Sequence, residues 1–115
     1  MLKILLADDD YSMVGLLKTL LDMEGYQVVT LLDKPGDILE NIRSAKPDIL
    51  LIDIFLGDHN GMDVVRQIRQ MPDLTGIRII MASGIDKREE CLAAGADVFL
   101  LKPYMPNELF EKLRP

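Results

Sequence analysis

At 115 residues, the chain is long enough for one domain but not for two, and a core of this size needs no disulfide or structural metal. Its formal net charge of −6 would repel phosphate backbones, which argues against direct binding to nucleic acid. No apolar run approaches the ~20 residues of a membrane span, and the single cysteine, Cys91, cannot form an internal disulfide. We therefore expect a reducing, cytoplasmic setting.

Short apolar segments alternate with amphipathic ones, and this alternation predicts five strands that take turns with five helices. The first strand is predicted over 2–7 and the first helix over 11–24, where Gly25 stands at a position that ends helices. The expected apolar stripe of this helix consists of Met13, Leu16, Leu17, Leu20 and Leu21. Gly15 lies inside the helix at a cost in helix stability, so we expect close packing against it.

The next strand is predicted over 27–32 and is followed by a helix that begins near Pro35. The apolar residues of that helix are Ile38, Leu39 and Ile42. Four apolar residues in a row and then Asp53 predict a third strand over 49–53, buried on both faces.

The third helix is predicted to open at Asn60-Gly61 and to end before Pro72. Its core-facing side chains are Val64, Val65, Ile68 and Met71. A fourth strand is predicted over 77–82, so that Ser83 would follow directly after its end.

The last part of the chain is predicted to form a helix over 86–94, a strand over 97–101 and a helix that begins over 106–113. The helix over 86–94 has a thin apolar stripe of Cys91, Leu92 and Ala94, so we expect it to be the least firmly held helix. The thiol of Cys91 is expected to be buried and without a catalytic role.

This pattern predicts an α/β fold, a single doubly wound (βα)5 flavodoxin-like domain over 1–115 with a parallel sheet. Right-handed crossovers leave few topologies, and the polar residues described below favour the strand order 2-1-3-4-5, which we predict and which places the first and third strands side by side. The domain could also be cut from a longer chain within or just after the last helix.

Polar residues follow the predicted strands: Asp8-Asp9-Asp10, Asp53, Ser83 and Lys102-Pro103. Because parallel strands end at one edge of the sheet, these side chains are expected to converge there. Two carboxylates ~4 Å apart repel by ~4 kcal/mol at an effective dielectric constant of ~20, so either one is protonated or a cation lies between them. A hard, oxygen-seeking ion such as Mg²⁺ suits this set, whereas no cluster of His or Cys favours zinc.

These segments together make the whole chain resemble the receiver domains of two-component response regulators. The resemblance implies that Asp53 accepts a phosphoryl group from a histidine kinase or a histidine phosphotransfer protein. It implies that Asp9 holds Mg²⁺ directly and Asp8 holds it through water, and that Asp53 and the backbone carbonyl of Phe55 complete the ligands. Ser83 and Lys102 would contact the phosphoryl group, and Asp10 would be an additional acid that caps a helix. The resemblance also raises the expectation of a cis Lys102-Pro103 bond.

Phe99 matches the aromatic switch position of that family. Phosphorylation is expected to draw Ser83 inward, so that Phe99 rotates and removes an exposed aromatic face from water. The surface formed by 86–94, 97–101 and 106–113 would then change for a partner or for a second copy of the chain in a homodimer. The competing interpretation is that Phe99 is a static core residue.

Two positions depart from the family pattern, which usually has Pro where Gly57 stands and Asp where Asn60 stands. Gly57 is expected to loosen the loop after Asp53, because glycine has more backbone freedom. His59, in the same loop, is interpreted as an exposed residue.

Three other functions remain open at this point. Asp8-x-Asp10 loosely imitates the signature of an aspartyl-phosphate phosphatase of the haloacid dehalogenase kind, although Tyr11-Ser12 follows instead of Gly-Thr. The second is a flavin carrier of the flavodoxin kind, which shares the topology. Its phosphate-binding loop would have to be Asp8-Asp9-Asp10, and these acids would repel the flavin phosphate. The third is a receiver-like protein-interaction module that never takes phosphate.

Overall fold

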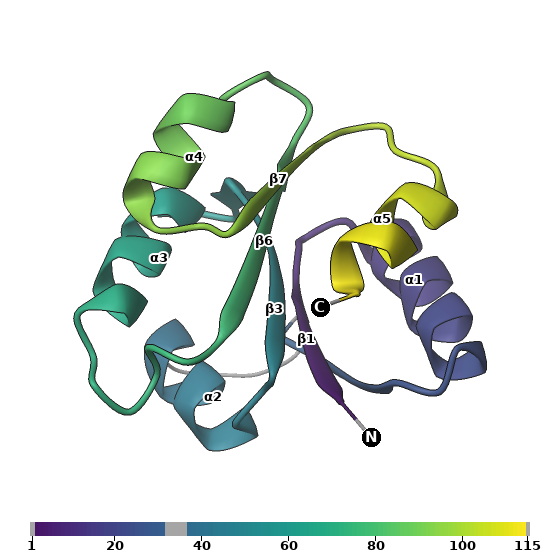
Figure 1. Cartoon of the computed structure of the whole chain (residues 1–115), viewed down its shortest axis with the longest axis horizontal. Helices are drawn as coiled ribbons and strands as arrows, with labels where there is room; N and C mark the ends of the chain where they lie inside the picture. Colours follow the sequence, from purple (N-terminus) through teal and green to yellow (C-terminus); the bar gives the residue numbers. More distant parts are fainter. Residues whose placement is uncertain (1, 32–36, 115) are drawn as a thin grey trace.

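The structure, a computed structural model, describes residues 2–31 and 37–114. Its main sheet consists of five parallel strands in the order β2-β1-β3-β6-β7 (Figure 1). The strands are β1 (Lys3–Ala7), β2 (Gln27–Thr30), β3 (Ile49–Asp53), β6 (Arg78–Ser83) and β7 (Val98–Leu101). This order is the predicted one, and it confirms the doubly wound fold. The predicted end of the second strand at Leu32, and Pro35, lie outside the described residues.

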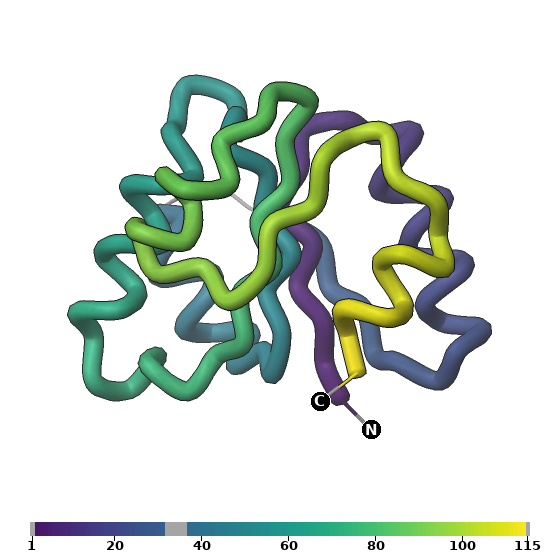
Figure 2. The backbone as a smooth tube through the Cα atoms, turned by 45° about the horizontal axis from the view of Figure 1, so that its top comes forward, coloured from purple at the N-terminus to yellow at the C-terminus, as the bar shows by residue number. Residues whose placement is uncertain are grey.

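Helices cover both faces of the sheet (Figure 1). They are α1 (Tyr11–Met23), α2 (Ile38–Ala45), α3 (Gly61–Arg69), α4 (Arg88–Ala94) and α5 (Pro106–Leu113). Figure 1 shows α2, α3 and α4 on one face, and α1 and α5 on the other. The loops at the carboxyl ends of the strands gather along one edge of the molecule, and the two termini lie close together away from that edge (Figure 2).

The central strands are apolar throughout because both of their faces are covered. Alternate residues point to opposite faces, so Leu5 and Leu50 enter the core beneath α2, α3 and α4, whereas Leu6 and Leu51 enter the core beneath α1 and α5. These alternating side chains account for the continuous apolar runs that the sequence shows at both strands.

The starts of α1, α2 and α3 are capped by the side chains of their N-cap residues. Asp10 accepts a hydrogen bond from the N–H of Met13, which confirms its predicted role as a helix cap. Asp37 and Asn60 cap α2 and α3 in the same way. Each cap satisfies an N–H that has no partner within its own helix.

The stripe of α1 differs from the prediction. Leu16 is 55% exposed, whereas Val14 is buried together with Leu17 and Leu21. The buried set follows the spacing i, i+3 and i+7, which keeps one face on the sheet, and Leu16 falls outside that arc. A Cβ atom at Gly15 would meet nothing within 4 Å, so the expected close packing there is wrong.

Helix α4 is shorter than predicted and begins at Arg88. The Arg88 N–H donates a hydrogen bond to the side chain of Asp86, which lies before the helix. Leu92 is exposed, so Cys91 and Ala94 alone among its residues are buried. The buried stripe is therefore even thinner than the sequence indicated.

Arg69, the last residue of α3, ties three segments together at the amino-terminal edge of the sheet. Its guanidinium donates to the carbonyl oxygens of Gly95 at 2.8 Å, Thr75 at 3.0 Å and Ile77 at 2.8 Å. It also donates to the carboxylate of Asp97 at 2.9 Å. The start of β7 and the end of α4 are thereby fixed to α3.

A short antiparallel hairpin between β3 and α3 was not predicted. Strand β4 (Phe55–Leu56) pairs with β5 (His59–Asn60), and Gly57 and Asp58 form the two-residue turn. Gly57 has a φ of +59°, a backbone conformation that side chains disfavour and that the first position of a type II′ turn requires.

Two further features bear on the sequence analysis. The peptide bond between Lys102 and Pro103 is cis, as expected. None of the helices within 2–31 and 37–114 is both long and apolar enough to span a membrane.

Candidate functional site

Three predicted site residues meet at the carboxyl edge of the sheet. The ammonium of Lys102, just after β7, donates to Asp8 Oδ2 at 2.7 Å and to Asp53 Oδ2 at 2.6 Å. Asp8 follows β1 and Asp53 ends β3, and these two strands are neighbours. All three side chains are mostly buried, so the pairs are shielded from water. The structure thus brings together the strand-end acids and the lysine.

The buried ion pairs determine the charge state of Lys102. Burial by itself lowers the pKa of the lysine, but the hydrogen bonds and charges of Asp53 and Asp8 outweigh this effect, so its pKa lies above the ordinary value. Lys102 therefore remains an ammonium at neutral pH, where it partly balances two carboxylates.

The backbone around Asp53 is held tightly. Asp53 Oδ1 accepts a hydrogen bond from the N–H of Phe55 at 3.0 Å, so both of its carboxylate oxygens have donors. Gly61, the first residue of α3, packs directly on this segment: a Cβ atom there would lie 2.2 Å from the backbone oxygen of Asp53. The sequence marked Gly61 as a helix start, but not as a residue whose missing side chain makes room for Asp53.

Asp9 faces the hairpin rather than Asp8. Its Oδ2 accepts a hydrogen bond from the N–H of Gly57 at 3.0 Å. In this arrangement, no three His, Cys, Asp or Glu side chains of the described residues converge on one point that could hold a metal. Lys102 lies between the other two acids.

The expected Mg²⁺ ligands nevertheless fit the ion by their chemistry. Asp8, Asp9 and Asp53 supply carboxylate oxygens and Phe55 supplies a backbone carbonyl, which are the hard oxygen ligands that Mg²⁺ prefers. Asp8 and Asp53 already share a cation, the Lys102 ammonium, so this edge of the sheet is built to hold positive charge.

Ser83 is the last residue of β6, not the residue after the strand, and its side chain is fully buried. Its Oγ accepts a hydrogen bond from the N–H of Ile85 at 3.1 Å. The hydroxyl proton is not used in this bond and can be donated elsewhere.

Phe99 is only 3% exposed, so the expectation that it shows an aromatic face to water is wrong for this structure. Its neighbour across the strand pair is Met81, and Ser83 lies two residues further along β6, on the same face of the sheet. Arg88, the first residue of α4, lies over the ring. Packing between the sheet and α4 therefore already encloses the aromatic side chain.

Tyr104 is a further residue near the site to which the sequence analysis assigned no role. Burial raises the pKa of its hydroxyl to about 12, while the charge of Lys102 lowers this pKa to a smaller extent and the charges of Asp8 and Asp53 add to the rise. Tyr104 therefore stays neutral and adds no charge beside Asp8 and Asp53.

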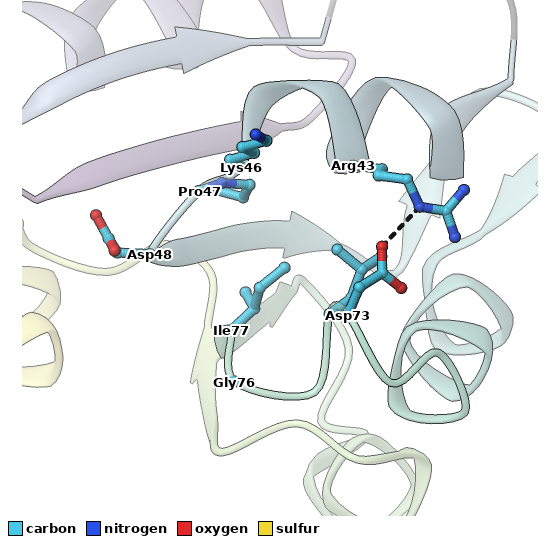
Figure 3. Close-up of a pocket in the computed structure, with 8 residues that line it drawn as sticks. Arg43, Lys46, Pro47, Asp48, Asp73, Gly76 and Ile77 are labelled. Carbon is cyan, nitrogen blue, oxygen red and sulfur yellow. Dashed lines mark hydrogen bonds and ion pairs between the residues drawn. The ribbon is translucent and has the colours of Figure 1, made fainter.

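A separate hollow lies at the opposite edge of the sheet, between α2 and the loop before β6 (Figure 3). Arg43 points across it and donates to Asp73 at 2.8 Å (Figure 3). The same guanidinium also bonds Glu40 within α2, so the bond to Asp73 is the one that joins α2 to the loop. Two of the charges that line this hollow, Arg43 and Asp73, thus bind each other.

Comparisons with known proteins agree with this geometry. A family model described as the response regulator receiver domain matches residues 4–114. The transcriptional regulatory protein CpxR of Klebsiella pneumoniae is 37% identical over 113 residues, which cover 97% of this chain and 47% of CpxR. The chain spans about half the length of the curated relatives that it matches.

Solved structures show the same fold. The chemotaxis protein CheY4 of Vibrio cholerae superposes with a TM-score of 0.86 at 28% identity, covering 98% of this chain and 96% of that one. The BeF3-activated receiver domain of Klebsiella pneumoniae RstA superposes with a TM-score of 0.82 at 29% identity, covering 97% and 95%.

Proposed function

The chain belongs to the response regulator receiver domain family, and on this basis we propose that it is a cytoplasmic phosphoacceptor switch with Asp53 as the acceptor. The observation that carries the proposal is the Lys102 ammonium, bonded to both Asp8 and Asp53 at one sheet edge. A lone strand-end aspartate could be a turn residue. A lysine shared between two buried acids, in contrast, can pair with the negative charge that phosphorylation of Asp53 adds and that hydrolysis removes.

In the proposed reaction, a carboxylate oxygen of Asp53 attacks the phosphorus of a phosphohistidine, carried by a histidine kinase or a histidine phosphotransfer protein. The new O–P bond forms as the P–N bond breaks, and the imidazole leaves with the electron pair and takes up a proton. Mg²⁺, held by Asp8, Asp9, Asp53 and the Phe55 carbonyl, would supply positive charge at the phosphoryl oxygens. The domain itself is a regulator rather than an enzyme.

Two residues of the chain would stabilise the product. Lys102 exchanges its bond to Asp53 Oδ2 for one to a phosphoryl oxygen, so its charge stays paired. Ser83 donates its free hydroxyl proton to another phosphoryl oxygen while it keeps its bond to the Ile85 N–H. This contact exists only in the phosphorylated state, as a population shift requires.

The output of the switch is proposed to be the surface of α4, β7 and α5. Leu92 of α4, Leu101 at the end of β7 and Met105, just before α5, are large apolar side chains exposed on these segments. A downstream partner, or a second copy of the chain in a homodimer, would cover them. RstA, a relative of this fold, has been obtained in a BeF3-activated form, which makes the same treatment suitable here.

The decisive experiment is incubation with Mg²⁺ and acetyl phosphate, followed by measurement of the intact mass. We expect a gain of one phosphoryl group that EDTA abolishes. Asp53→Asn should gain none, and Asp63→Asn, which changes an exposed acid on α3, should react like the wild type. Label on another residue, or label unaffected by EDTA, would overturn the assignment.

Two alternatives give other results in the same assay. A receiver-like interaction module would take no phosphate at any Mg²⁺ concentration. An aspartyl-phosphate phosphatase would turn over phosphate esters many times per molecule, instead of stopping at one phosphoryl group.

A further inference from the structure

We propose that the backbone N–H of Gly57 is a positioning group for the cation site. By its bond to Asp9, it orients that carboxylate and couples the β4–β5 hairpin to cation binding. This inference rests on the proposed function, because it takes Asp9 as a ligand of Mg²⁺. It assigns a role to the Gly57 N–H, which the reaction above does not use.

The hairpin presents two donors to the acids. Phe55 N–H donates to Asp53 Oδ1 at 3.0 Å, and Gly57 N–H donates to Asp9 Oδ2 at 3.0 Å. Successive N–H groups of an extended strand point to opposite edges, so the N–H groups of Phe55, in β4, and of Gly57, the first residue after β4, point to one edge of the hairpin. That edge therefore lies against both carboxylates, although Asp9 and Gly57 are 48 residues apart in the chain.

The rest of the hairpin fixes this edge in place. Leu56, between the two donors, is buried in the core beneath α2, α3 and α4. The turn depends on Gly57, because the first position of a type II′ turn has a positive φ, here +59°, that suits glycine. A proline at position 57 could neither adopt this φ nor donate the hydrogen bond to Asp9.

The bond matters because Asp9 is exposed and would otherwise be free to rotate. With Oδ2 bonded to Gly57, Oδ1 remains available for the ion, and the carboxylate loses less freedom when the ion binds. Groups that orient metal ligands in this way typically contribute 10–100-fold to metal affinity. The Phe55 carbonyl belongs to the same hairpin, so one rigid unit would position two of the expected ligands.

The test measures Mg²⁺ affinity directly, by titration followed through amide NMR shifts, and needs no phosphorylation. Gly57→Pro removes the donor, and we expect its dissociation constant to rise about tenfold. Gly57→D-Ala, made by the same chemical synthesis as an ester variant, keeps the N–H and suits the positive φ, so its affinity should stay within about twofold of the wild type. Replacement of the Gly57 amide by an ester removes the N–H without restricting φ, and it should reproduce the loss of the proline variant.

Other outcomes of the titration would overturn the inference. An ester variant with wild-type affinity would show that the bond is irrelevant, and tighter binding would show that it competes with the ion. An equal loss in the D-alanine variant would assign the effect to loop shape instead of the donor. Asp53 could fail to accept phosphate while the ester variant still binds Mg²⁺ more weakly than the wild type. That result would contradict the proposed function but would still support this inference.

A metal-free measurement provides an independent check. Amide exchange at Gly57 should be slower than at Asp58 in the wild type, because the Gly57 N–H is bonded to Asp9. It should accelerate in Asp9→Ala, which removes the acceptor, and stay unchanged in Asp58→Ala. Equal exchange at Gly57 with and without the Asp9 carboxylate would contradict the proposal.

Discussion

The guanidinium carbon of Arg88 lies 5.7 Å from the centroid of the Phe99 ring, which places the first residue of α4 over the aromatic side chain of β7. This is the range in which a cation is attracted by an aromatic face. The contact joins the start of α4, which has no side-chain cap from Lys87, to the residue at the proposed switch position. The position of α4 and the environment of Phe99 are therefore coupled.

Arg88→Met should loosen this contact, because it keeps an apolar stem over the ring but removes the charge. We expect a loss of about 0.5–1 kcal/mol in the free energy of unfolding by urea, and Arg88→Lys should recover part of it. The amides of 88–91 should exchange faster in the methionine variant. Unchanged stability and exchange would mean that the arginine merely lies near the ring.

Ser83→Ala should still accept phosphate but should respond less at α4. The variant loses the acceptor for the Ile85 N–H, so we expect a stability cost of about 1 kcal/mol. NMR shifts with and without beryllofluoride measure the response, with Ser44→Ala on exposed α2 surface as the control. If α4 shifts as much in Ser83→Ala as in the wild type, the hydroxyl does not transmit the signal.

Gly61→Ala should be destabilising, because the new Cβ atom would lie 2.2 Å from the backbone oxygen of Asp53. Overpacking of this kind typically costs 1–3 kcal/mol, and the shift should also slow phosphorylation of Asp53. Gly84→Ala is a matched control, since a Cβ atom there meets nothing within 4 Å. Urea unfolding of both variants tests the prediction, which equal midpoints would refute.

Cys91 can report whether α4 opens on its own. Its side chain is fully buried, and burial raises the pKa of the thiol, so it should resist alkylation in the folded protein. If α4 is the least firmly held helix, labelling should depend on urea far less steeply than global unfolding does, because a local opening exposes little surface. A slope equal to that of global unfolding would show that α4 opens only with the whole domain.

The features that were predictable from the sequence are those set by long-range pattern. Continuous apolar strands required a sheet covered on both faces, and this places Asp8, Asp53 and Lys102 at one edge. Short features, and features that depend on individual side-chain contacts, were not predictable from the sequence. The two-residue strands β4 and β5 are too brief for any periodicity, and the Gly57 bond to Asp9 uses a backbone group that the sequence does not distinguish.

Burial within a helix was predicted less well, because it depends on how the helix is rotated on the sheet. Leu16 and Val14 are both apolar, and only packing decides that Val14 faces inward. Phe99 shows the same limit, because the sequence of an apolar strand does not indicate which rotamer an aromatic residue adopts. In the structure its side chain is buried.

The hydrogen bonds of Arg69 provide a fixed point, or fulcrum, at the carboxyl end of α4. Because the guanidinium holds the Gly95 carbonyl at 2.8 Å, the carboxyl end of the helix is anchored, whereas its other end is held by the contact of Arg88 with Phe99 and by the bond from the Arg88 N–H to Asp86. Seven residues make a lever of about 10 Å, so a tilt of about 10° at the fulcrum would swing Arg88 by about 2 Å. A displacement of about 2 Å is smaller than the 3.1 Å that separates the Ile85 nitrogen from Ser83 Oγ, so the making or breaking of one hydrogen bond near Ser83 spans enough distance to move α4 by this amount.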